Sequence, residues 1–598
     1  MQAVSTSPYH LSMARKFNTW YTIRDGNFSD PGVWISNGSK KHSYPQAGDN
    51  VYVNNNIFLD ISNISINNLV ISGSINANAS VTVTIIVNGD CQVGGSGLIN
   101  LQLQFHNLIL NGYNNIIPYS SLDAGSFSSI TYNASTDSQA ILNLPYKNLN
   151  TQGGQKYQID DVTVDGTFNQ QSNYDCGNYN LTVNGASLIG TTGRCTFYKT
   201  GPGNLLFIGN VDFEGNTDLT GGNPNIEFRG GLAIHTFSLK IGNGNIVFTT
   251  NDQTINCNAF LAGTWSASTT IQGAITVTLV GGYIFTLSST INGTVSGSTF
   301  NNSGELYLAY NTVPMTTGTF NYMFTSTSTI GYVFDGASTL PYTTYANLVI
   351  DGTGLKLLGG NTIINQSLEL SGNGFDGGLD TNGYDLTVST TFNNQGLFTA
   401  NAFSNILFNG LATWTNGPNG QGVDLRIGNP NIEFRGGLTC HANFIYTGTG
   451  TYTFSTNDQT LDMIVSNGGE WACNLLVSGA ITLTYIGGTF STNLINGILN
   501  GNDAASTFIN NGIFSYANSQ QPMQTGKLYC NQTANTFYYC APGNQDITEP
   551  SDSTPAYQNL TLNGSGAKRL LGNVSVIGAY LLTSPATLNS NGFSLTNP

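Results

Sequence analysis

A ten-residue motif, called the repeated phrase below, occurs twice in the chain without a change. This repetition constrains the fold more than any other feature. The phrase NPNIEFRGGL begins at residue 223 and again at residue 429, 206 positions later. The stretches around it keep the same offset, because FTTNDQTI at residue 248 returns as FSTNDQTL at residue 454, and GAITVT at residue 273 returns as GAITLT at residue 479. A large unit has therefore been duplicated in tandem, and repetition on this scale indicates an array.

The composition decides what kind of array this is. Charged residues make up 8% of the chain, against roughly 25% in ordinary soluble domains. Short apolar alternations are interrupted by Asn-Gly or Ser-Gly, as in residues 64–73 and 81–89, and this pattern is typical of stacked strands with tight corners. We therefore predict an all-β, elongated parallel β-solenoid; the alternative is a string of β-sandwich modules, since each unit is long enough to form separate domains.

A second phrase, aromatic-x-Asn-Leu, marks the boundaries of the units and begins at residues 105, 146, 345 and 557. Before the repeats, Trp20, Trp34 and a Gly-Asp turn suit an element that covers the raw strand edges at the end of a solenoid. The predicted organisation is an N-terminal arm (1–19), a cap-like segment (20–53), a first β-solenoid segment (54–145), repeat unit A (146–344), repeat unit B (345–556) and a truncated third unit (557–598).

The repeat phrases also carry a resemblance. Tyr-x-Asn-Leu-x-apolar-x-Gly-x-Gly, then Lys-Leu-x-Gly, then Asn-Gly-aromatic-x-Leu-Thr resembles repeat arrays in large surface proteins of Bacteroidota and in structural proteins of the phages that infect them. Residues 20–53 resemble the Trp…Pro-x-x-Trp…Pro-x-x-Gly-Asp-x-Val start that precedes many bacterial and phage parallel β-helices. No basic region followed by an apolar one is evident at the N-terminus, and the last residues lie inside a repeat, so we favour the phage over the host version.

The resemblance implies a structural virion protein, of the tail-fibre, tail-spike or head-fibre kind, that projects from the particle and contributes to attachment to the host surface. Two alternatives stay open: a glycan-depolymerising tail spike, and a Bacteroidota cell-surface adhesin. The expected location is the virion, assembled in the host cytoplasm, or the cell exterior for an adhesin. The expected partners are other virion proteins, through the N-terminal arm or an uncapped C-terminal end, a host surface glycan or protein, and copies of the chain itself, with a trimer as one option.

Charge and hydropathy exclude two classes of partner. The chain has 17 Lys and Arg residues and a net charge of −15, so it offers no basic surface to neutralise phosphates, and we expect no nucleic-acid binding. No apolar run approaches the roughly 20 residues of a membrane-spanning helix, so we expect no membrane insertion.

Few residues could carry chemistry. Glu227 precedes Arg229 by two positions, and Glu433 precedes Arg435 in the same way, so each pair lies on one face of a strand. A neighbouring cation favours the ionised carboxylate, and we interpret both pairs as structural ion pairs rather than acid catalysts. His235 and His441 are equivalent but lack further ligands nearby in sequence. We predict no catalytic residues, no metal site and no cofactor.

The tryptophans leave one binding hypothesis. Trp265 and Trp471 are retained in both copies and are candidates for stacking on sugar rings; packing in the core explains them equally well. The eight cysteines contain no CxxC pair and do not recur at the repeat offset. We expect free buried thiols, and a pairing of Cys530 with Cys540 stays open.

Overall fold

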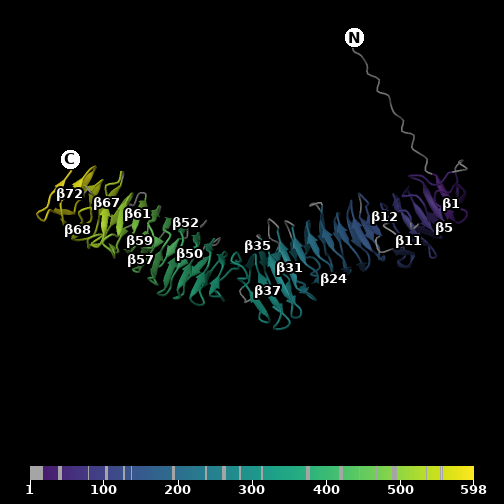
Figure 1. Ribbon diagram of the computed structural model, residues 1–598, viewed down its shortest axis with the longest axis horizontal. Coiled ribbons are helices and arrows are strands. Elements are labelled where there is room, and N and C mark those ends of the chain that lie inside the picture. The colour runs from purple at the N-terminus through teal and green to yellow at the C-terminus, as the bar shows by residue number, and fades with distance from the viewer. Residues whose placement is uncertain are drawn as a thin grey trace, which may run out of the picture. The chain divides into compact units, whose positions relative to one another are not determined.

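The computed structural model forms a parallel β-solenoid of about 22 turns, with 50% of residues in strands and 1% in helices. The alternative of β-sandwich modules is therefore wrong. Figure 1 follows the chain from purple to yellow. The structure describes residues 18–37, 43–77, 80–101, 106–124, 128–135, 138–191, 195–235, 239–258, 264–281, 284–310, 314–371, 377–415, 422–442, 445–464, 469–487, 494–533, 535–552, 554 and 556–597. The predicted arm, residues 1–19, lies outside this description except for its last two residues.

Each turn of the solenoid places a short strand beside the matching strand of the turn before it. Every recorded pairing between described strands is parallel, except that of β1 (Thr19–Thr22) with β3 (Trp34–Ser36), which is antiparallel. Within most strands, buried and more accessible residues alternate, as in β27 (Asn225–Phe228), because successive side chains point to opposite faces. The apolar half of each strand fills the interior, and the other half forms the outer surface.

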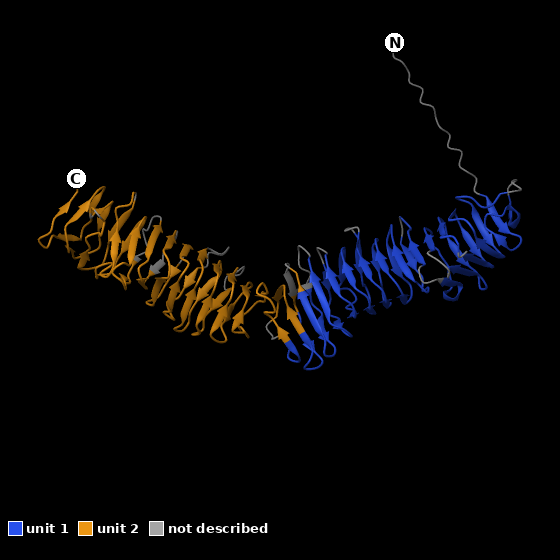
Figure 2. Cartoon of the chain, in the orientation of Figure 1, with its two compact units in different colours: residues 1–279, 289–299, 315–319 blue, residues 280–288, 300–314, 320–598 orange. Residues whose placement is uncertain are grey.

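Two compact units divide the chain, coloured blue and orange in Figure 2. Unit 1 comprises residues 1–279, 289–299 and 315–319, and unit 2 comprises residues 280–288, 300–314 and 320–598. Most of the predicted repeat unit A belongs to unit 1, and repeat unit B belongs to unit 2.

Unit 1 begins with the predicted cap-like segment. Trp20 is buried and donates its indole N–H to Asp49 Oδ2 at 2.8 Å, and Trp34 donates its own to the carbonyl oxygen of Phe28 at 2.8 Å. A 3-10 turn, η1 (Pro31–Val33), leads into β3, whose antiparallel pairing interrupts the parallel stacking. A second 3-10 turn, η2, spans Tyr119–Ser121.

Two sheets of unit 1 position the surfaces discussed below. Sheet I contains β16 (Asn148–Thr151), β19 (Phe168–Gln170), β22 (Ser187–Ile189), β25 (Val211–Phe213), β28 (Leu232–Ile234) and β31 (Gln253–Cys257), among others. Sheet II contains β18 (Val162–Val164), β21 (Leu181–Val183), β24 (Asn204–Phe207), β27, β30 (Asn245–Phe248), β33 (Ser268–Ile271) and β36 (Ile291–Gly293).

Unit 2 repeats both sheets. The strands of sheet III that lie in unit 2 include β38 (Glu305–Leu308), β40 (Thr329–Tyr332), β43 (Asn347–Ile350), β46 (Ser367–Leu370), β49 (Thr391–Asn394), β52 (Ala412–Thr415), β55 (Leu438–His441) and β58 (Gln459–Met463). Sheet IV contains β42 (Thr344–Tyr345), β45 (Thr362–Ile364), β48 (Leu386–Val388), β51 (Asn405–Phe408), β54 (Asn431–Phe434), β57 (Thr451–Ser455), β60 (Asn474–Ser478) and β63 (Leu499–Gly501).

The two copies match strand by strand while their connections differ in length. Tyr146 and Tyr345 begin the copies 199 positions apart, whereas the repeated phrase lies 206 apart. Residues 214–215 join β25 to β26 (Asn216–Leu219), but residues 416–422 join β52 to β53 (Val423–Asp424). The extra residues fall between strands, so the pairing of the sheets is unchanged.

Aromatic ladders run through the core of both units. In unit 1, Phe228 stacks between Phe207 at 5.7 Å and Phe248 at 5.6 Å, measured between ring centroids. In unit 2, Phe434 stacks between Phe408 at 5.6 Å and Phe454 at 5.1 Å. Such contacts add to the burial of the rings themselves, which explains why the phrase keeps its Phe in both copies.

Burial and hydrogen bonding explain the tyrosine that begins the aromatic-x-Asn-Leu phrase at the boundary of each copy. Tyr146 is fully buried, and its hydroxyl donates to the carbonyl oxygen of Leu142 at 2.6 Å. Shortly after the phrase, each copy carries a lysine whose ammonium donates to backbone carbonyls: Lys156 to Gly154 at 2.7 Å, and Lys356 to Gly336 at 2.7 Å. A buried ammonium must be hydrogen-bonded, so the turn carbonyls around each lysine serve that need.

Candidate functional site

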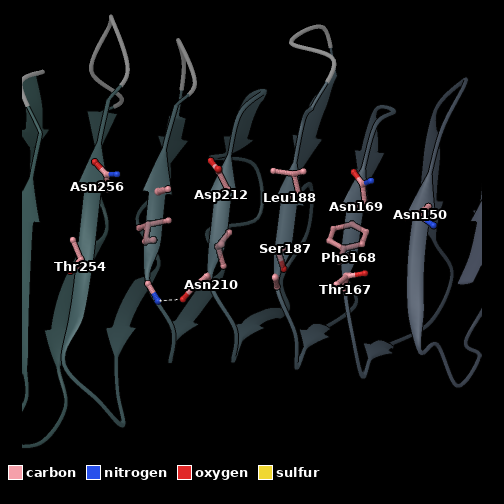
Figure 3. A pocket seen from close by; sticks show the side chains of 15 residues that line it. Asn150, Thr167, Phe168, Asn169, Ser187, Leu188, Asn210, Asp212, Thr254 and Asn256 are labelled. Carbon is pink, nitrogen blue, oxygen red and sulfur yellow. Dashed lines mark hydrogen bonds between the residues drawn. The ribbon is translucent and has the colours of Figure 1, made fainter. Parts of the chain in front are cut away.

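The outer face of sheet I carries a groove of about 730 Å³ that follows six successive strands, β16 to β31 (Figure 3). One row of outward side chains runs in register along it. Figure 3 shows that row above a second, lower row that includes Thr167, Asn210 and Thr254. The upper row consists of Asn150, Asn169, Leu188, Asp212, Ala233 and Asn256.

The groove combines apolar and polar groups in a fixed order. Leu188 and Ala233 flank Asp212, and adjacent rungs of a sheet lie about 4.8 Å apart. Asp212 Oδ1 lies 2.8 Å from Nδ1 of His235, two residues beyond Ala233 on the same chain segment, and His235 Nε2 lies 3.4 Å from Asn258 Nδ2. The lower row is held too, because the Gly231 amide donates to Asn210 Oδ1 at 2.9 Å. The surface is therefore an ordered strip of amide, carboxylate and imidazole groups around a small apolar centre.

The matching row of unit 2, on sheet III, has a different chemistry. This row lacks the apolar centre found on sheet I, and carboxylates occupy the second and last positions of the row. His441, equivalent to His235, bonds through Nε2 to Asp462 Oδ2 at 3.1 Å, so its partner comes from the following strand rather than the preceding one. The row consists of Val349, Glu369, Asn393, Thr413, Thr439 and Asp462.

A second, polar groove of about 500 Å³ lies at the start of this face and contains Glu305 and Glu369. Tyr307, which also lines the groove, packs against Gly331, where a β-carbon would come within 2.4 Å of the tyrosine ring. Partial burial raises the pKa of the Glu305 carboxyl, and the charge of Glu369 raises it further. The groove thus holds two carboxyl groups, and the pKa of one of them, Glu305, is raised above its ordinary value.

The Glu–Arg pairs predicted from spacing lie on sheets II and IV. Arg229 Nε lies 2.6 Å from Glu227 Oε1, and Arg435 Nε lies 2.8 Å from Glu433 Oε1. Partial burial works to raise the pKa of both carboxyls, but the hydrogen bonds and charge of the arginines outweigh it, so both pKa values lie below the ordinary value. Neither carboxylate is suited to donate a proton.

The glycan-stacking hypothesis for the two tryptophans requires a correction. Trp265 is 2% exposed and Trp471 is 0% exposed. Trp265 stacks on Phe248 at 6.4 Å, and Trp471 meets the edge of Tyr452 at 5.9 Å. Both indoles point into the interior, so no ligand sugar can reach them and core packing accounts for their retention.

Asp252 and Asp458, which belong to the repeated Asn-Asp-Gln-Thr stretch, have structural roles. Asp252 and Asp458 accept the backbone amides of Thr276 and Thr482, each at 2.7 Å. In the part of the chain that the structure describes, no three His, Cys, Asp or Glu side chains gather as a metal site requires. All eight cysteines are free, including Cys530 and Cys540.

Sequence reasoning missed the outward rows because their members lie on different turns. Leu188 and Asp212 are 24 positions apart, and Glu305 and Glu369 are 64 apart, with connections of variable length between them. The only available signal was the alternation within each strand, which shows that a residue faces outward but not which outward residues become neighbours.

Comparisons with known proteins give no further guide, because no family model, no curated protein and no solved structure matches the chain. Among the described residues, no helix is both long and apolar enough to cross a membrane.

Proposed function

We propose that the protein is a structural attachment protein, of the virion fibre or spike class, that binds an extended surface glycan along sheet I of unit 1. The observation that carries the proposal is the order of side chains in the groove. Leu188 and Ala233 offer an apolar patch, and amide and carboxylate groups stand on the rungs to either side. A sugar chain has the complementary pattern, with C–H faces for the apolar patch and hydroxyls for the polar groups.

The assignment to a phage particle is supported by the repeat phrases and the N-terminal pattern that resemble phage and Bacteroidota proteins. Immunogold electron microscopy of purified particles tests it. Label on the particle surface is expected, while label only on the host cell would favour the adhesin alternative.

Glycan binding is tested by a matched pair of variants. Leu188→Asp puts a charge in the apolar centre of the groove, and Asn393→Asp puts the same charge at the equivalent place on sheet III. On an array of host-surface glycans, L188D is expected to lose binding by about tenfold or more, because an apolar contact becomes a buried charge. N393D should bind as the unaltered protein does. Equal binding by both variants would remove the groove from the proposal.

A second candidate, glycan depolymerisation, has one observation in its favour: Glu305 and Glu369 line the same groove, and partial burial raises the pKa of Glu305. Glycoside hydrolysis uses a protonated carboxyl and a second carboxylate. An assay for new reducing ends on host capsule decides between the two. Release that disappears in Glu305→Gln would favour the enzyme, and absence of release from the unaltered protein would leave attachment as the function.

A further inference from the structure

The duplicated Glu–Arg phrase lies on a second kind of surface, separate from the groove of sheet I. In unit 1 it borders a groove of about 630 Å³ on the outer face of sheet II. The floor of this groove is a row in register along five strands. Its members are Thr163, Thr182, Leu206, Glu227 and Val247.

Sheet IV of unit 2 presents the same arrangement. There too a leucine and a glutamate stand side by side on adjacent rungs, Leu407 beside Glu433 as Leu206 is beside Glu227. The two end positions differ, with Ile363 in place of Thr163 and Thr453 in place of Val247. The row consists of Ile363, Thr387, Leu407, Glu433 and Thr453.

A wall of Asp and Asn side chains borders each floor and is fixed by bonds between turns. In unit 1, Asp161 accepts the amide of Asn180 at 2.9 Å, and Asn180 accepts that of Asn204 at 2.7 Å. In unit 2, Asn361 accepts the amide of Asp385 at 3.0 Å, which accepts that of Asn405 at 2.8 Å. Side chains held in this way are already ordered before a ligand arrives, which lowers the entropic cost of binding.

The glutamates themselves are held by one oxygen only. Glu227 Oε1 accepts from Arg229 Nε at 2.6 Å and from the Thr249 hydroxyl at 2.9 Å. Glu433 Oε1 accepts from Arg435 Nε at 2.8 Å and from the Ser455 hydroxyl at 2.6 Å. Among the described residues, Oε2 of neither glutamate accepts a hydrogen bond, although both side chains are about one-third exposed, at 32% and 36%.

We propose that sheets II and IV carry two copies of one glycan-binding subsite. In each copy, the free Oε2 of Glu227 or Glu433 accepts hydrogen bonds from sugar hydroxyls, and Leu206 or Leu407 beside it contacts the C–H face of the ring. The arginine and the hydroxyl fix the carboxylate in place, and charged acceptors form the stronger hydrogen bonds. The ligand class is a neutral, linear, extended glycan, because the floor continues in register across five rungs and the arginine beside each glutamate is already paired. This inference rests on the proposed attachment function and gives the chain two sites beyond the groove of sheet I.

Titration calorimetry with two extended probes, cellohexaose and chitohexaose, tests the inference. The L188D chain silences the groove of sheet I, so the expected stoichiometry of the better probe is two per chain. Leu206→Asp added to the L188D chain should reduce the stoichiometry to one, and Leu407→Asp added instead should do the same. The triple variant with L188D, L206D and L407D should bind no probe. Thermal unfolding of each variant checks that the outward aspartates leave the fold intact.

Conservative variants keep the test valid if an aspartate disturbs the sheet. Glu227→Gln and Glu433→Gln preserve size and should each weaken one of the two sites by about tenfold, the size expected for a charged hydrogen bond. Loss of all binding in L188D alone would overturn the inference and leave the groove proposal standing. Two sites that persist in L188D and respond to neither leucine nor glutamate variants would also overturn it. If neither the unaltered chain nor any variant binds either probe, both proposals fail.

Discussion

The two copies of the repeat agree along an inward stack of phenylalanines and differ along one outer row, that of sheets I and III. The inward Phe228 of unit 1 is again Phe in unit 2, as Phe434, and both stand in aromatic stacks. On the outer row, by contrast, Leu188 is matched by Asn393, and Asp212 is matched by Thr413. Close packing restricts inward positions, whereas an outward position only has to suit a strand, so a duplicated unit can acquire a second surface without a new fold.

The paired histidines show how little backbone change this needs. His235 bonds to Asp212 on the strand before it, while His441 bonds to Asp462 on the strand after it. Every outward residue of a parallel sheet has a neighbour on both sides. A partner can therefore change sides by two substitutions, with the register of the sheet unchanged.

The largest expected effect is the loss of stability on removing the buried tryptophan of either unit. It tests whether the interiors of the two units are packed equally well. Trp265→Ala and Trp471→Ala each remove a buried indole and should lower stability by about 3–5 kcal/mol, since both a cavity and lost contacts result. Because Tyr452 stands where unit 1 has Ile246, the two tryptophans pack differently, and hydrogen exchange on each unit will show whether the costs differ. A variant that kept its stability but lost glycan binding would restore the stacking hypothesis.

The second-largest expected effect is a pH dependence of stability that arises from one buried cysteine thiol in each unit. Burial raises the pKa of Cys91 and of Cys473 from 9.0 to about 12. The unfolded chain therefore releases these protons at a lower pH than the folded chain does, so their contribution is complete below pH 9 and is lost as pH rises toward 12. Between pH 8 and pH 10.5 the contribution of each thiol to the free energy of unfolding should fall by about 2 kcal/mol.

Denaturant unfolding at pH 8 and pH 10.5 measures this dependence. Cys91→Ala and Cys473→Ala should each reduce the difference between the two pH values by a similar amount. A pH dependence that survives in the double variant would assign it to other groups, such as the buried tyrosines.

A third prediction concerns the outer row of sheet III, which is changed to resemble the outer row of sheet I. Glu369→Asn with Asn393→Leu gives sheet III the amide–leucine order of Asn169 and Leu188 on sheet I. We expect binding of the glycan that unit 1 selects to appear on unit 2, with an affinity within about tenfold of the original, or about 1.4 kcal/mol. The graft is made in the chain that carries L188D, L206D and L407D together, which should bind no glycan, so that any binding observed belongs to the grafted row of sheet III. No gain would mean that the lower row or His235 is needed as well.

The smallest effect distinguishes the two ion pairs. Arg435 Nη1 also donates to Asn409 Oδ1 at 3.1 Å, a bond that is not recorded for Arg229 among the described residues. Arg435→Ala should therefore destabilise the chain slightly more than Arg229→Ala, and both costs should lie at or below about 1 kcal/mol because the pairs are partly exposed. Parallel thermal melts of the two variants compare them, and a larger cost for Arg229→Ala would show that Asn409 contributes nothing.

The sequence predicts the fold well because the solenoid is a local pattern repeated many times. Alternating apolar residues and Asn-Gly breaks are visible within single strands, and the two-residue spacing of Glu227 and Arg229 places both on one face. The surfaces are harder to predict, because they depend on connections of variable length that decide which rungs become neighbours. Trp265 was ambiguous for a related reason: its own short strand does not show whether it faces inward, and only its pairing with the buried Ile241 does.

The unequal connections between matched strands have a consequence for how such a chain can change over time. The copies differ by seven positions between an offset of 199 at Tyr146 and one of 206 at the repeated phrase, and the connections absorb the difference. Insertions at the corners are thus nearly neutral for the framework, while single substitutions on the faces alter what it recognises. Length and outer surface can be inherited and selected separately, which would suit the attachment function proposed above.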